Sequence, residues 1–260
     1  MSSTAEPLLR RERDARGVVT LTLNRPQVFN TLSEALLEQL QQELDALMSD
    51  ATVRVLVLAA AGKAFCAGHD LREMRAQPSV EYYQRLFGRC SHMMLTLRRL
   101  PVPVIARVQG IATAAGCQLV AQCDLAVASS EARFAVSGVN LGLFCSTPAV
   151  PLSRNVACKQ AFEMLLTGEF IDAAEAQRRG LVNRVVEPAA LDAELEGLVA
   201  SIVALPRVAI ALGKELFYRQ SELPIAAAYE AAGQTMARNM MDEAALERVQ
   251  AFIEKRAARV

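Results

Sequence analysis

No apolar run in the 260-residue chain approaches the roughly 20 residues that a membrane-spanning helix needs. The formal net charge is +0, so neither nucleic acid nor an anionic membrane surface is expected as the main partner. The first 17 residues lack the apolar core of a signal peptide. They also carry acidic side chains that are unusual in a mitochondrial presequence, namely Glu6, Glu12 and Asp14. These absences predict a globular protein of the cytoplasm.

Two kinds of binding motif are also missing. The six cysteines include no C-x-x-C pair, so neither a metal site nor a disulfide framework is indicated, and reduced, packed thiols are expected. No G-x-G-x-x-G follows a strand, and no G-x-x-x-x-G-K occurs. A doubly wound nucleotide-binding domain is therefore a weak hypothesis.

The most informative stretch is residues 104–123. Val104–Val108 is a short β-branched run that predicts a buried strand. Small residues follow at 110–116, and then apolar residues at helical spacing. A strand that turns through small residues into a helix directs free backbone N–H groups and the positive end of the helix dipole outward. Such a turn can hold an anionic ligand, or it can be a tight packing corner, and both interpretations stay open.

Alternating elements surround this stretch. Further strands are expected at residues 18–23, 53–59, 125–128, 133–136 and 182–186. Helices are expected to include residues 36–47, 86–97, 159–166 and 172–179. Residues 137–149 suit an irregular pocket wall. From residue 190 onward only helices are expected, at 190–203, 206–219, 222–240 and 242–257, which predicts a boundary near 190 and a helical oligomerisation region.

Two helix starts follow from spacing of polar residues. Thr31 with Glu34 forms a capping-box pattern, and Asp70 with Glu73 forms a similar one. Asp70 is thus more simply a helix cap than a catalyst.

The chain resembles the enoyl-CoA hydratase/isomerase (crotonase) superfamily in register over nearly its whole length. The resemblance rests on residues 23–32, 53–58, 64–71, 103–106, 115–119, 166–168 and 251–256. Within the superfamily, residues 142–148 are most similar to the branch called enoyl-CoA hydratase domain-containing protein 3. The resemblance implies an α/β fold, a crotonase-type spiral of β-β-α repeats. It also implies a core with an acyl-CoA pocket at 1–190 and a helical trimerisation region at 191–260.

The resemblance further implies a ligand and a site. Members bind acyl-CoA thioesters, assemble as trimers or hexamers, and need no metal and no cofactor beyond the coenzyme A of the substrate. Two backbone N–H groups, here those of His69 and Ala115, form an oxyanion hole for the thioester oxygen. The residues implied to line the substrate are Gln27, Val28, Phe29, Ala67, Gly68, Asp70, Leu71, Gly116 and Asn140. Candidate phosphate partners are Arg25, Lys63, Lys159 and Lys255, although a solvated surface charge is the simpler interpretation of each.

The chain departs from the family at two catalytic positions. The two glutamates of the hydratases align with Gln118 and Gly138, and neither is a carboxylate. An amide cannot accept a proton near pH 7, and each positioned acid–base group is worth ~10²–10⁴ in rate. We therefore expect ordinary hydration and isomerisation to be severely impaired.

Several substitutes for the glutamates stay open. The His69 ring could shuttle a proton. Cys145 or Ser146 could act as a nucleophile, although neither has an evident base. Cys117 is most simply a packed thiol. Three hypotheses about function stay open. The protein could be an enzyme that uses the oxyanion hole alone, as in decarboxylation of a malonyl-type thioester, or a slow hydratase with a Gln118-bound water. It could also be a non-catalytic acyl-CoA binding or scaffold protein.

Overall fold

A computed structural model of the chain describes residues 6–257, and its larger sheet organises the fold. The strand order is β1-β2-β3-β5-β7-β10, with every pair parallel except β1 and β2. These strands are β1 (Leu9–Arg13), β2 (Val18–Leu23), β3 (Val55–Ala60), β5 (Val104–Val108), β7 (Leu125–Ser129) and β10 (Arg184–Val186).

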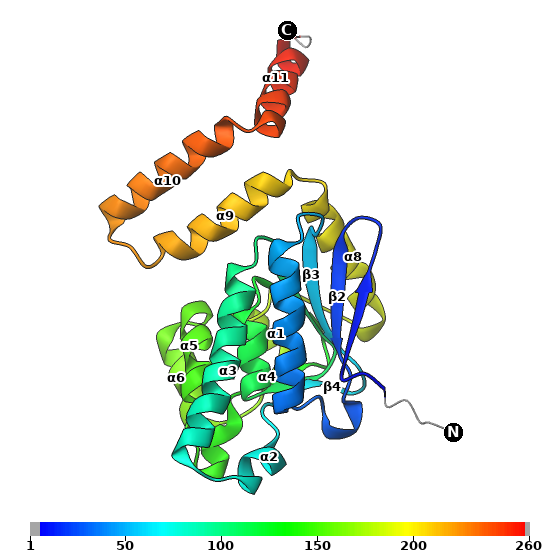
Figure 1. The fold of residues 1–260 in the computed structure, drawn as a ribbon, viewed down its shortest axis with the longest axis vertical. Helices are drawn as coiled ribbons and strands as arrows, with labels where there is room; N and C mark the ends of the chain where they lie inside the picture. Colours follow the sequence, from blue (N-terminus) through cyan, green and yellow to red (C-terminus); the bar gives the residue numbers. More distant parts are fainter. Residues whose placement is uncertain (1–5, 258–260) are drawn as a thin grey trace.

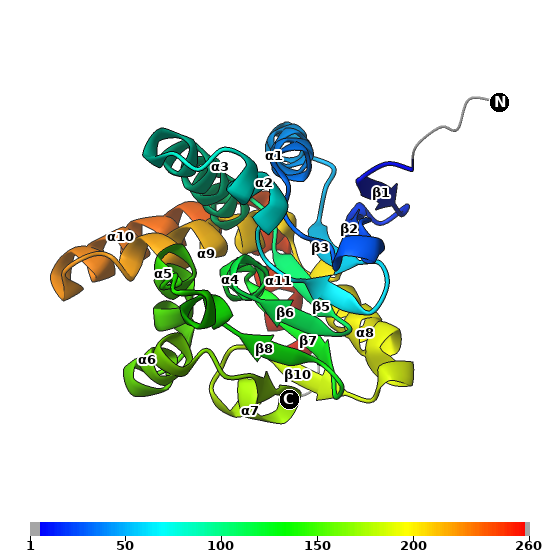
Figure 2. The same cartoon turned by 90° about the horizontal axis from the view of Figure 1, so that it is seen from below.

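A smaller sheet has the order β4-β6-β8-β9. It contains β4 (Ala64–Cys66), β6 (Ile111–Thr113), β8 (Arg133–Ala135) and β9 (Ile171–Asp172). Three successive passages of the chain each give one strand to the larger sheet, one to the smaller sheet, and then a helix (Figure 2). These helices are α2 (Leu71–Ala76) with α3 (Val80–Arg99), then α4 (Ala115–Gln122), then α5 (Ser146–Asn155). This is the β-β-α spiral that the sequence predicted.

Side-chain alternation divides the core between the two faces of the larger sheet. In β3, Leu56 and Leu58 belong to the main apolar cluster, which also contains the buried leucines of α1 (Glu34–Ser49). The intervening Val55 and Val57 pack instead with side chains of α8 (Leu191–Val203). Because a strand exposes alternate residues to opposite faces, a continuous apolar run is needed to cover both sides.

The remaining helices connect the sheets or extend beyond them. Near the sheets lie η1 (Pro26–Val28), η2 (Ser137–Leu141), α6 (Cys158–Thr167), α7 (Ala173–Arg178) and η3 (Pro188–Ala190). The C-terminal arm consists of α9 (Arg207–Gln220), α10 (Ile225–Met240) and α11 (Glu243–Ala257). In Figure 1, α9 lies across one end of the α/β body, whereas α10 and α11 lie beyond it. Since α8 packs on the sheet, the helices that project begin with α9.

No single helix of residues 6–257 has the length and apolar composition to cross a membrane. The segments Pro188–Val203 and Arg207–Gln220 meet that test only as a pair, and the pair is bent by 102°.

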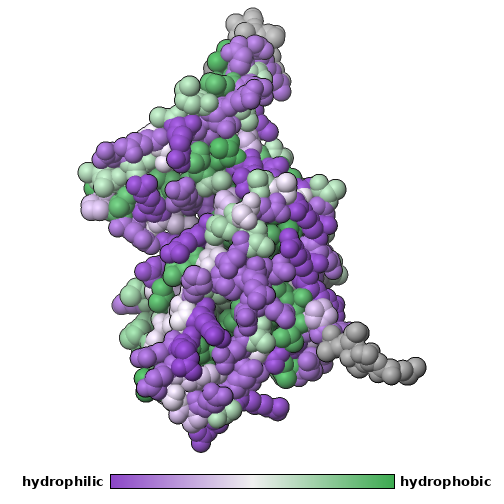
Figure 3. All heavy atoms as spheres, in the orientation of Figure 1, coloured by the Kyte–Doolittle hydropathy of each residue, from purple (hydrophilic) through white to green (hydrophobic). Residues whose placement is uncertain are grey.

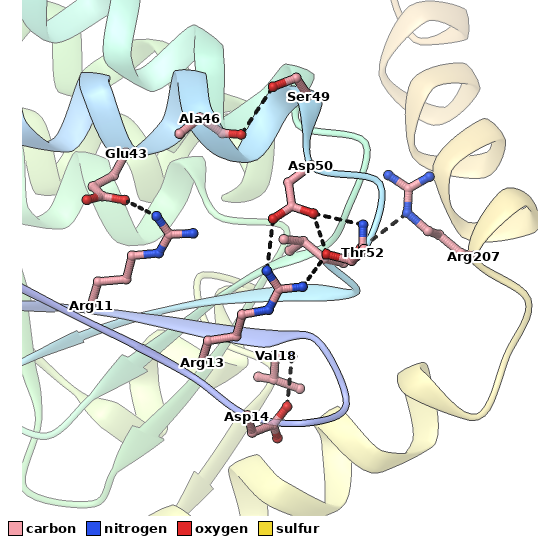
Figure 4. Close-up of polar contacts among 11 residues, drawn as sticks. Arg11, Arg13, Asp14, Val18, Glu43, Ala46, Ser49, Asp50, Thr52 and Arg207 are labelled. Atoms are coloured by element: carbon pink, nitrogen blue, oxygen red, sulfur yellow. Dashed lines mark hydrogen bonds and ion pairs between the residues drawn. The ribbon is translucent and has the colours of Figure 1, made fainter.

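Charged residues cover the edge strand β1 (Figure 4). Arg11 donates to Glu43 of α1 at 3.0 Å, and Arg13 donates to Asp50 at 2.9 Å. The exposed edge of a sheet is a template for unwanted strand pairing, and charges on it discourage that pairing. Arg207 donates to the Val53 carbonyl at 3.1 Å, which ties the start of α9 to the loop before β3.

The structure corrects some local predictions. Of the expected irregular stretch 137–149, residues 137–141 form η2 and residues from 146 onward form α5, so only residues 142–145 lie outside a helix. Ser33, not Thr31, caps α1, and it accepts a hydrogen bond from the Leu36 N–H at 3.2 Å. The cap at Asp70 is confirmed, since its carboxylate accepts from the Arg72 N–H at the start of α2.

Candidate active site

The first component of the site is the loop that follows β4. The Leu32 N–H donates to the Gly68 carbonyl at 2.8 Å, and the Asp70 N–H donates to the Leu32 carbonyl at 3.3 Å. In a parallel bridge of this kind, the residue between the two bonded groups directs its own N–H to the opposite side. The His69 N–H therefore faces away from Leu32, and it has no acceptor among residues 6–257. Gly68 has φ +96°, which a residue with a side chain rarely adopts.

The second component is the turn into α4. Ala114 adopts φ +51° and ψ −121°, a strained conformation for alanine that costs about 1–3 kcal/mol. Its N–H donates to the Ala135 carbonyl at 3.0 Å, and its carbonyl accepts the first helical bond, from Gln118. The N–H groups of Ala115, Gly116 and Cys117 are free within the described chain, because nothing precedes them in the helix to accept.

The two components are in contact. A Cβ atom added at Gly68 would lie 3.0 Å from the Ala114 Cβ and 3.4 Å from the Ala115 nitrogen. A Cβ at Gly116 would lie only 2.0 Å from the Cys66 carbonyl oxygen. The small residues thus let α4 pack directly on β4, and this packing brings the free N–H groups of His69 and Ala115 close together. The interpretation as a tight packing corner is therefore confirmed, and ligand binding at the same turn stays a prediction.

Gln118 lies one turn into α4. Its side chain is 3% exposed, and its Oε1 has no hydrogen-bond partner in the described chain. The side chain at this position is therefore a buried amide with an unused acceptor, and a buried polar group without a partner costs free energy.

Gly138 is enclosed by its own loop. Its N–H donates to the Cys145 sulfur at 3.3 Å. A Cβ at Gly138 would lie 2.4 Å from the Leu143 carbonyl oxygen and 2.8 Å from the Cys145 Sγ. The space that a side chain at position 138 would need is therefore filled, and any larger residue requires the loop to move.

Burial sets the protonation of the groups around the site. Burial lowers the pKa of His69 to about 4, and the Leu32 backbone opposes this shift. The imidazole is thus neutral at pH 7. Burial raises the pKa of Cys117 to about 12 and also raises the pKa of Cys145, although the Gly138 N–H opposes the latter shift. Both thiols are protonated at neutral pH, which disfavours a nucleophilic role for Cys145.

The residues implied to line coenzyme A form one surface. The Ala67 N–H donates to the Phe29 carbonyl at 3.0 Å, which joins η1 to the loop after β4. Phe29 and Leu71 are both 54% exposed on this surface. Gln27, Val28 and Asp70 lie on the same two segments, and Gly68 is buried between them and α4.

Two charged candidates in this region already have partners. Arg25 donates to Asp70 at 3.1 Å and to the Thr31 carbonyl at 2.6 Å. Burial alone would raise the pKa of Asp70, but Arg25 and the N–H groups at the start of α2 outweigh it and lower the pKa. These contacts join the loop before α1 to α2, so both residues have a structural role.

The remaining predicted residues lie elsewhere. The Asn140 amide points to the Gly168 carbonyl, at 3.5 Å. Lys63, Lys159 and Lys255 are exposed, and their phosphate contacts stay predictions. In residues 6–257, no three His, Cys, Asp or Glu side chains are grouped so that they could hold a metal ion.

Sequence reasoning missed three contributors to the site. Ala114 gives no sign of its strained φ, because that conformation normally signals itself through glycine. Leu143 closes over Gly138 through its backbone carbonyl, which no sequence pattern encodes. Phe87 packs edge-on against the His69 ring, with centroids 5.5 Å apart. Phe87 lies on α3, and no pattern in the sequence links it to the loop that carries His69.

Comparison with known proteins agrees with this architecture. The family model of enoyl-CoA hydratase/isomerase matches residues 13–259. Enoyl-CoA hydratase domain-containing protein 3 of Mus musculus, described as mitochondrial, is 43% identical over 254 residues, covering 98% of this chain and 85% of its own. The short-chain-enoyl-CoA hydratase of Clostridium acetobutylicum is 34% identical over 245 residues, covering 92% of each protein.

Solved structures agree as well. The crystal structure of an enoyl-CoA hydratase from Mycobacterium smegmatis has 67% identity and a TM-score of 0.96, covering 96% of this chain and 97% of its own. The crystal structure of human enoyl-CoA hydratase domain-containing protein 3 has 42% identity and a TM-score of 0.92, and the match covers 96% of this chain and 98% of the human chain. With the family model spanning nearly the whole chain and relatives this similar over their full folds, the chain belongs to the enoyl-CoA hydratase/isomerase family.

Proposed function

We propose that the protein binds an acyl-CoA thioester and stabilises negative charge on the thioester oxygen with the N–H groups of His69 and Ala115. The observation that carries the proposal is the contact between the two loops, which brings these free donors together. Backbone donors at the N-terminus of a helix stabilise an enolate without reorganisation, and one such donor is worth ~10²–10³ in rate.

The missing carboxylates limit the reaction. Gln118 cannot take a proton, and Gly138 has no side chain. Decarboxylation of a malonyl-type thioester suits this site because it needs no protein base. The bond between the α-carbon and the carboxylate breaks, carbon dioxide leaves, and the electron pair becomes the enolate on the thioester oxygen. Water then protonates the α-carbon.

A second function, non-catalytic acyl-CoA binding, is supported by a different observation. Cys145 and Leu143 fill the space beside Gly138, so the loop is closed where the family's second carboxylate would project. A protein that kept the fold and the thioester site but lost hydration would have this arrangement. A slow hydratase with a water held by Gln118 lies between the two functions.

One experiment separates these functions. The purified protein is incubated with crotonyl-CoA and with methylmalonyl-CoA, alongside Gln118→Glu and a surface control, Gln42→Glu. We expect carbon dioxide release from methylmalonyl-CoA, little hydration of crotonyl-CoA, and about 10²-fold faster hydration in Gln118→Glu. Rapid hydration by the unaltered protein would refute the importance of the missing carboxylates. Binding of both thioesters without turnover would favour the non-catalytic function.

We also propose that the protein assembles as a trimer or a hexamer through its C-terminal arm. Apolar side chains gather over α9 and α10 (Figure 3), and one stripe of α10 carries Ile225, Tyr229, Met236 and Met240. Ile225 and Tyr229 are 75% and 74% exposed in the single chain. Exposed apolar patches of this kind mark protein interfaces. Light scattering should give a multiple of the 28.2 kDa chain, and Tyr229→Asp with Met236→Asp should reduce it to a monomer, unlike the control Met48→Asp.

A further inference from the structure

The arm contains a cavity of about 190 Å³ between α9 and α10, which lie side by side and antiparallel in Figure 1. Only these two helices line it. The lining residues are Glu215, Leu216 and Arg219 of α9, with Ala231, Gln234, Thr235 and Arg238 of α10. None of them belongs to the proposed thioester site, so the cavity is a separate feature of the arm.

The cavity also faces away from the apolar stripe of α10. Gln234 and Arg238 are four residues apart and therefore share one face of the helix. Met236 of the stripe lies midway between them in sequence. At 3.6 residues per turn, its side chain is roughly 200° around the helix axis from either one. Assembly of the protein through the stripe therefore does not need to cover the cavity.

Two arginines without partners border the cavity, one from each helix. The guanidinium groups of Arg219 and Arg238 donate to no carboxylate or carbonyl among residues 6–257. Other arginines of the arm do have partners, since Arg207 donates to the Val53 carbonyl at 3.1 Å and Arg248 donates to the Ala204 carbonyl at 3.0 Å. Two cations that border one space repel each other, and an anion between them converts this repulsion into attraction.

The other polar groups of the lining restrict the kind of anion. Glu215 forms no ion pair within residues 6–257, so its carboxylate is an unused acceptor. The Gln234 Nε2 donates to Glu230 at 3.3 Å, which leaves the Gln234 carbonyl oxygen as a second acceptor. The lining thus offers guanidinium donors together with acceptors. A matching ligand is an anion that also carries a proton to donate.

Hydrogen phosphate has both properties at neutral pH. Its charged oxygens can accept from both guanidinium groups, and its hydroxyl can donate to a carboxylate. Sulfate has no proton to donate, and an ionised carboxylic acid has only two acceptor oxygens and no donor. A nucleotide is too large for this space, because pockets for ligands of that size measure about 300–1,000 Å³.

We propose that the cavity between α9 and α10 is a binding site for inorganic phosphate. Arg219 and Arg238 hold the charged oxygens from the two sides, and Glu215 accepts the hydroxyl proton of the ligand in a hydrogen bond. The bound anion connects α9 to α10 and so stabilises the arm. This site is independent of acyl-CoA binding, so its failure would leave the proposed function untouched.

Calorimetry of the purified protein tests the site with phosphate and with sulfate at equal ionic strength and pH 7. We expect saturable binding of one phosphate per chain with a dissociation constant on the order of 1 mM. Sulfate should bind about 10-fold more weakly, because it leaves the Glu215 carboxylate without a donor. Adenosine monophosphate should not compete with phosphate. Equal binding of the two inorganic anions, or effective competition by the nucleotide, would overturn the assignment to inorganic phosphate.

Variants assign the binding to the cavity. Arg219→Gln and Arg238→Gln should each weaken phosphate binding about 10-fold, and the double variant should show no saturable binding. Glu215→Gln removes the carboxylate that opposes sulfate, so the ratio of the two affinities should approach about 1. Arg85→Gln, an exposed change on α3, should bind phosphate as the unaltered protein does. Binding that does not saturate, or that persists in the double variant, would show an adventitious ion only and would refute the site.

Discussion

The α/β body and the C-terminal arm are stabilised in different ways. In the body, whole helix faces are buried, as in the five leucines of α1. In α9, the one buried side chain is Lys214, and α10 buries only Ala228 and Ala231. The body therefore contains a complete hydrophobic core, whereas the arm contacts the body through polar groups and leaves an apolar stripe exposed in the single chain.

Lys214 is the centre of the contact between the two regions. Its ammonium donates to Asp124 at 2.7 Å and to the carbonyls of Leu97 and Val102 at 3.0 Å each. The Tyr218 hydroxyl donates to the same Asp124 carboxylate at 2.6 Å. Burial lowers the pKa of Lys214, although Asp124 opposes the shift. The contact between α9 and the body is thus centred on the charged Lys214 and not on an apolar side chain.

The largest expected effect comes from breaking this contact. Lys214→Met would leave the partly buried Asp124, whose side chain is 14% exposed, without its cation, so we expect the free energy of unfolding to fall by about 3 kcal/mol. Urea unfolding measures the change, with the exposed Lys159→Met as a control that should lie within about 0.5 kcal/mol of the unaltered protein. A loss below 1 kcal/mol would mean that the network does not anchor the arm.

A pair of glycine substitutions compares the two regions directly. Gly116→Ala places a methyl group 2.0 Å from the Cys66 carbonyl oxygen, and we expect a loss of about 3 kcal/mol because the packed corner must separate. Gly213→Ala, in α9, meets nothing within 4 Å and should stabilise the helix by up to about 1 kcal/mol. Thermal unfolding of both variants measures the change in stability relative to the unaltered protein. Similar stability would show that the corner between β4 and α4 is loose.

A smaller effect follows from the protonation of His69. Its pKa falls from 6.5 to about 4 on folding, so the unfolded chain binds more protons between these values, and stability rises with pH across that window. Relative to His69→Gln, the unaltered protein should lose about 2 kcal/mol between pH 7 and pH 5. Urea unfolding at both pH values measures the difference, and His92→Gln provides the matched control. A constant difference between the two proteins would place the His69 ring in solvent.

Long elements of the fold could be predicted from the sequence, and short ones could not. Long, periodic elements were predicted well, including the four C-terminal helices and the buried strand Val104–Val108. The three-residue strands β4 and β6 were missed because they are too short for any periodicity, although they carry the loops of the site. Helix α5 was not predicted because it contains Pro148 and Pro151, and proline usually interrupts a helix.

The site was predictable only in part. The small residues before α4 predicted free backbone N–H groups at this turn, whereas His69 and Ala115 were named as donors only through family resemblance, and that role stays a prediction. The enclosure of Gly138 could not be foreseen, since it depends on a backbone carbonyl five residues away. The unpaired nitrogens of His69 likewise arise from packing between distant helices and loops.

We propose that two main-chain amides, those of His69 and Ala115, hold one thioester carbonyl. Infrared difference spectroscopy of bound butyryl-CoA, with ¹³C at the thioester carbonyl, measures that contact without requiring turnover. Two hydrogen bonds polarise the carbonyl, so we predict that its stretching band moves to lower frequency than in water and narrows. A band at the solution frequency, with the ligand demonstrably bound, would contradict the central claim.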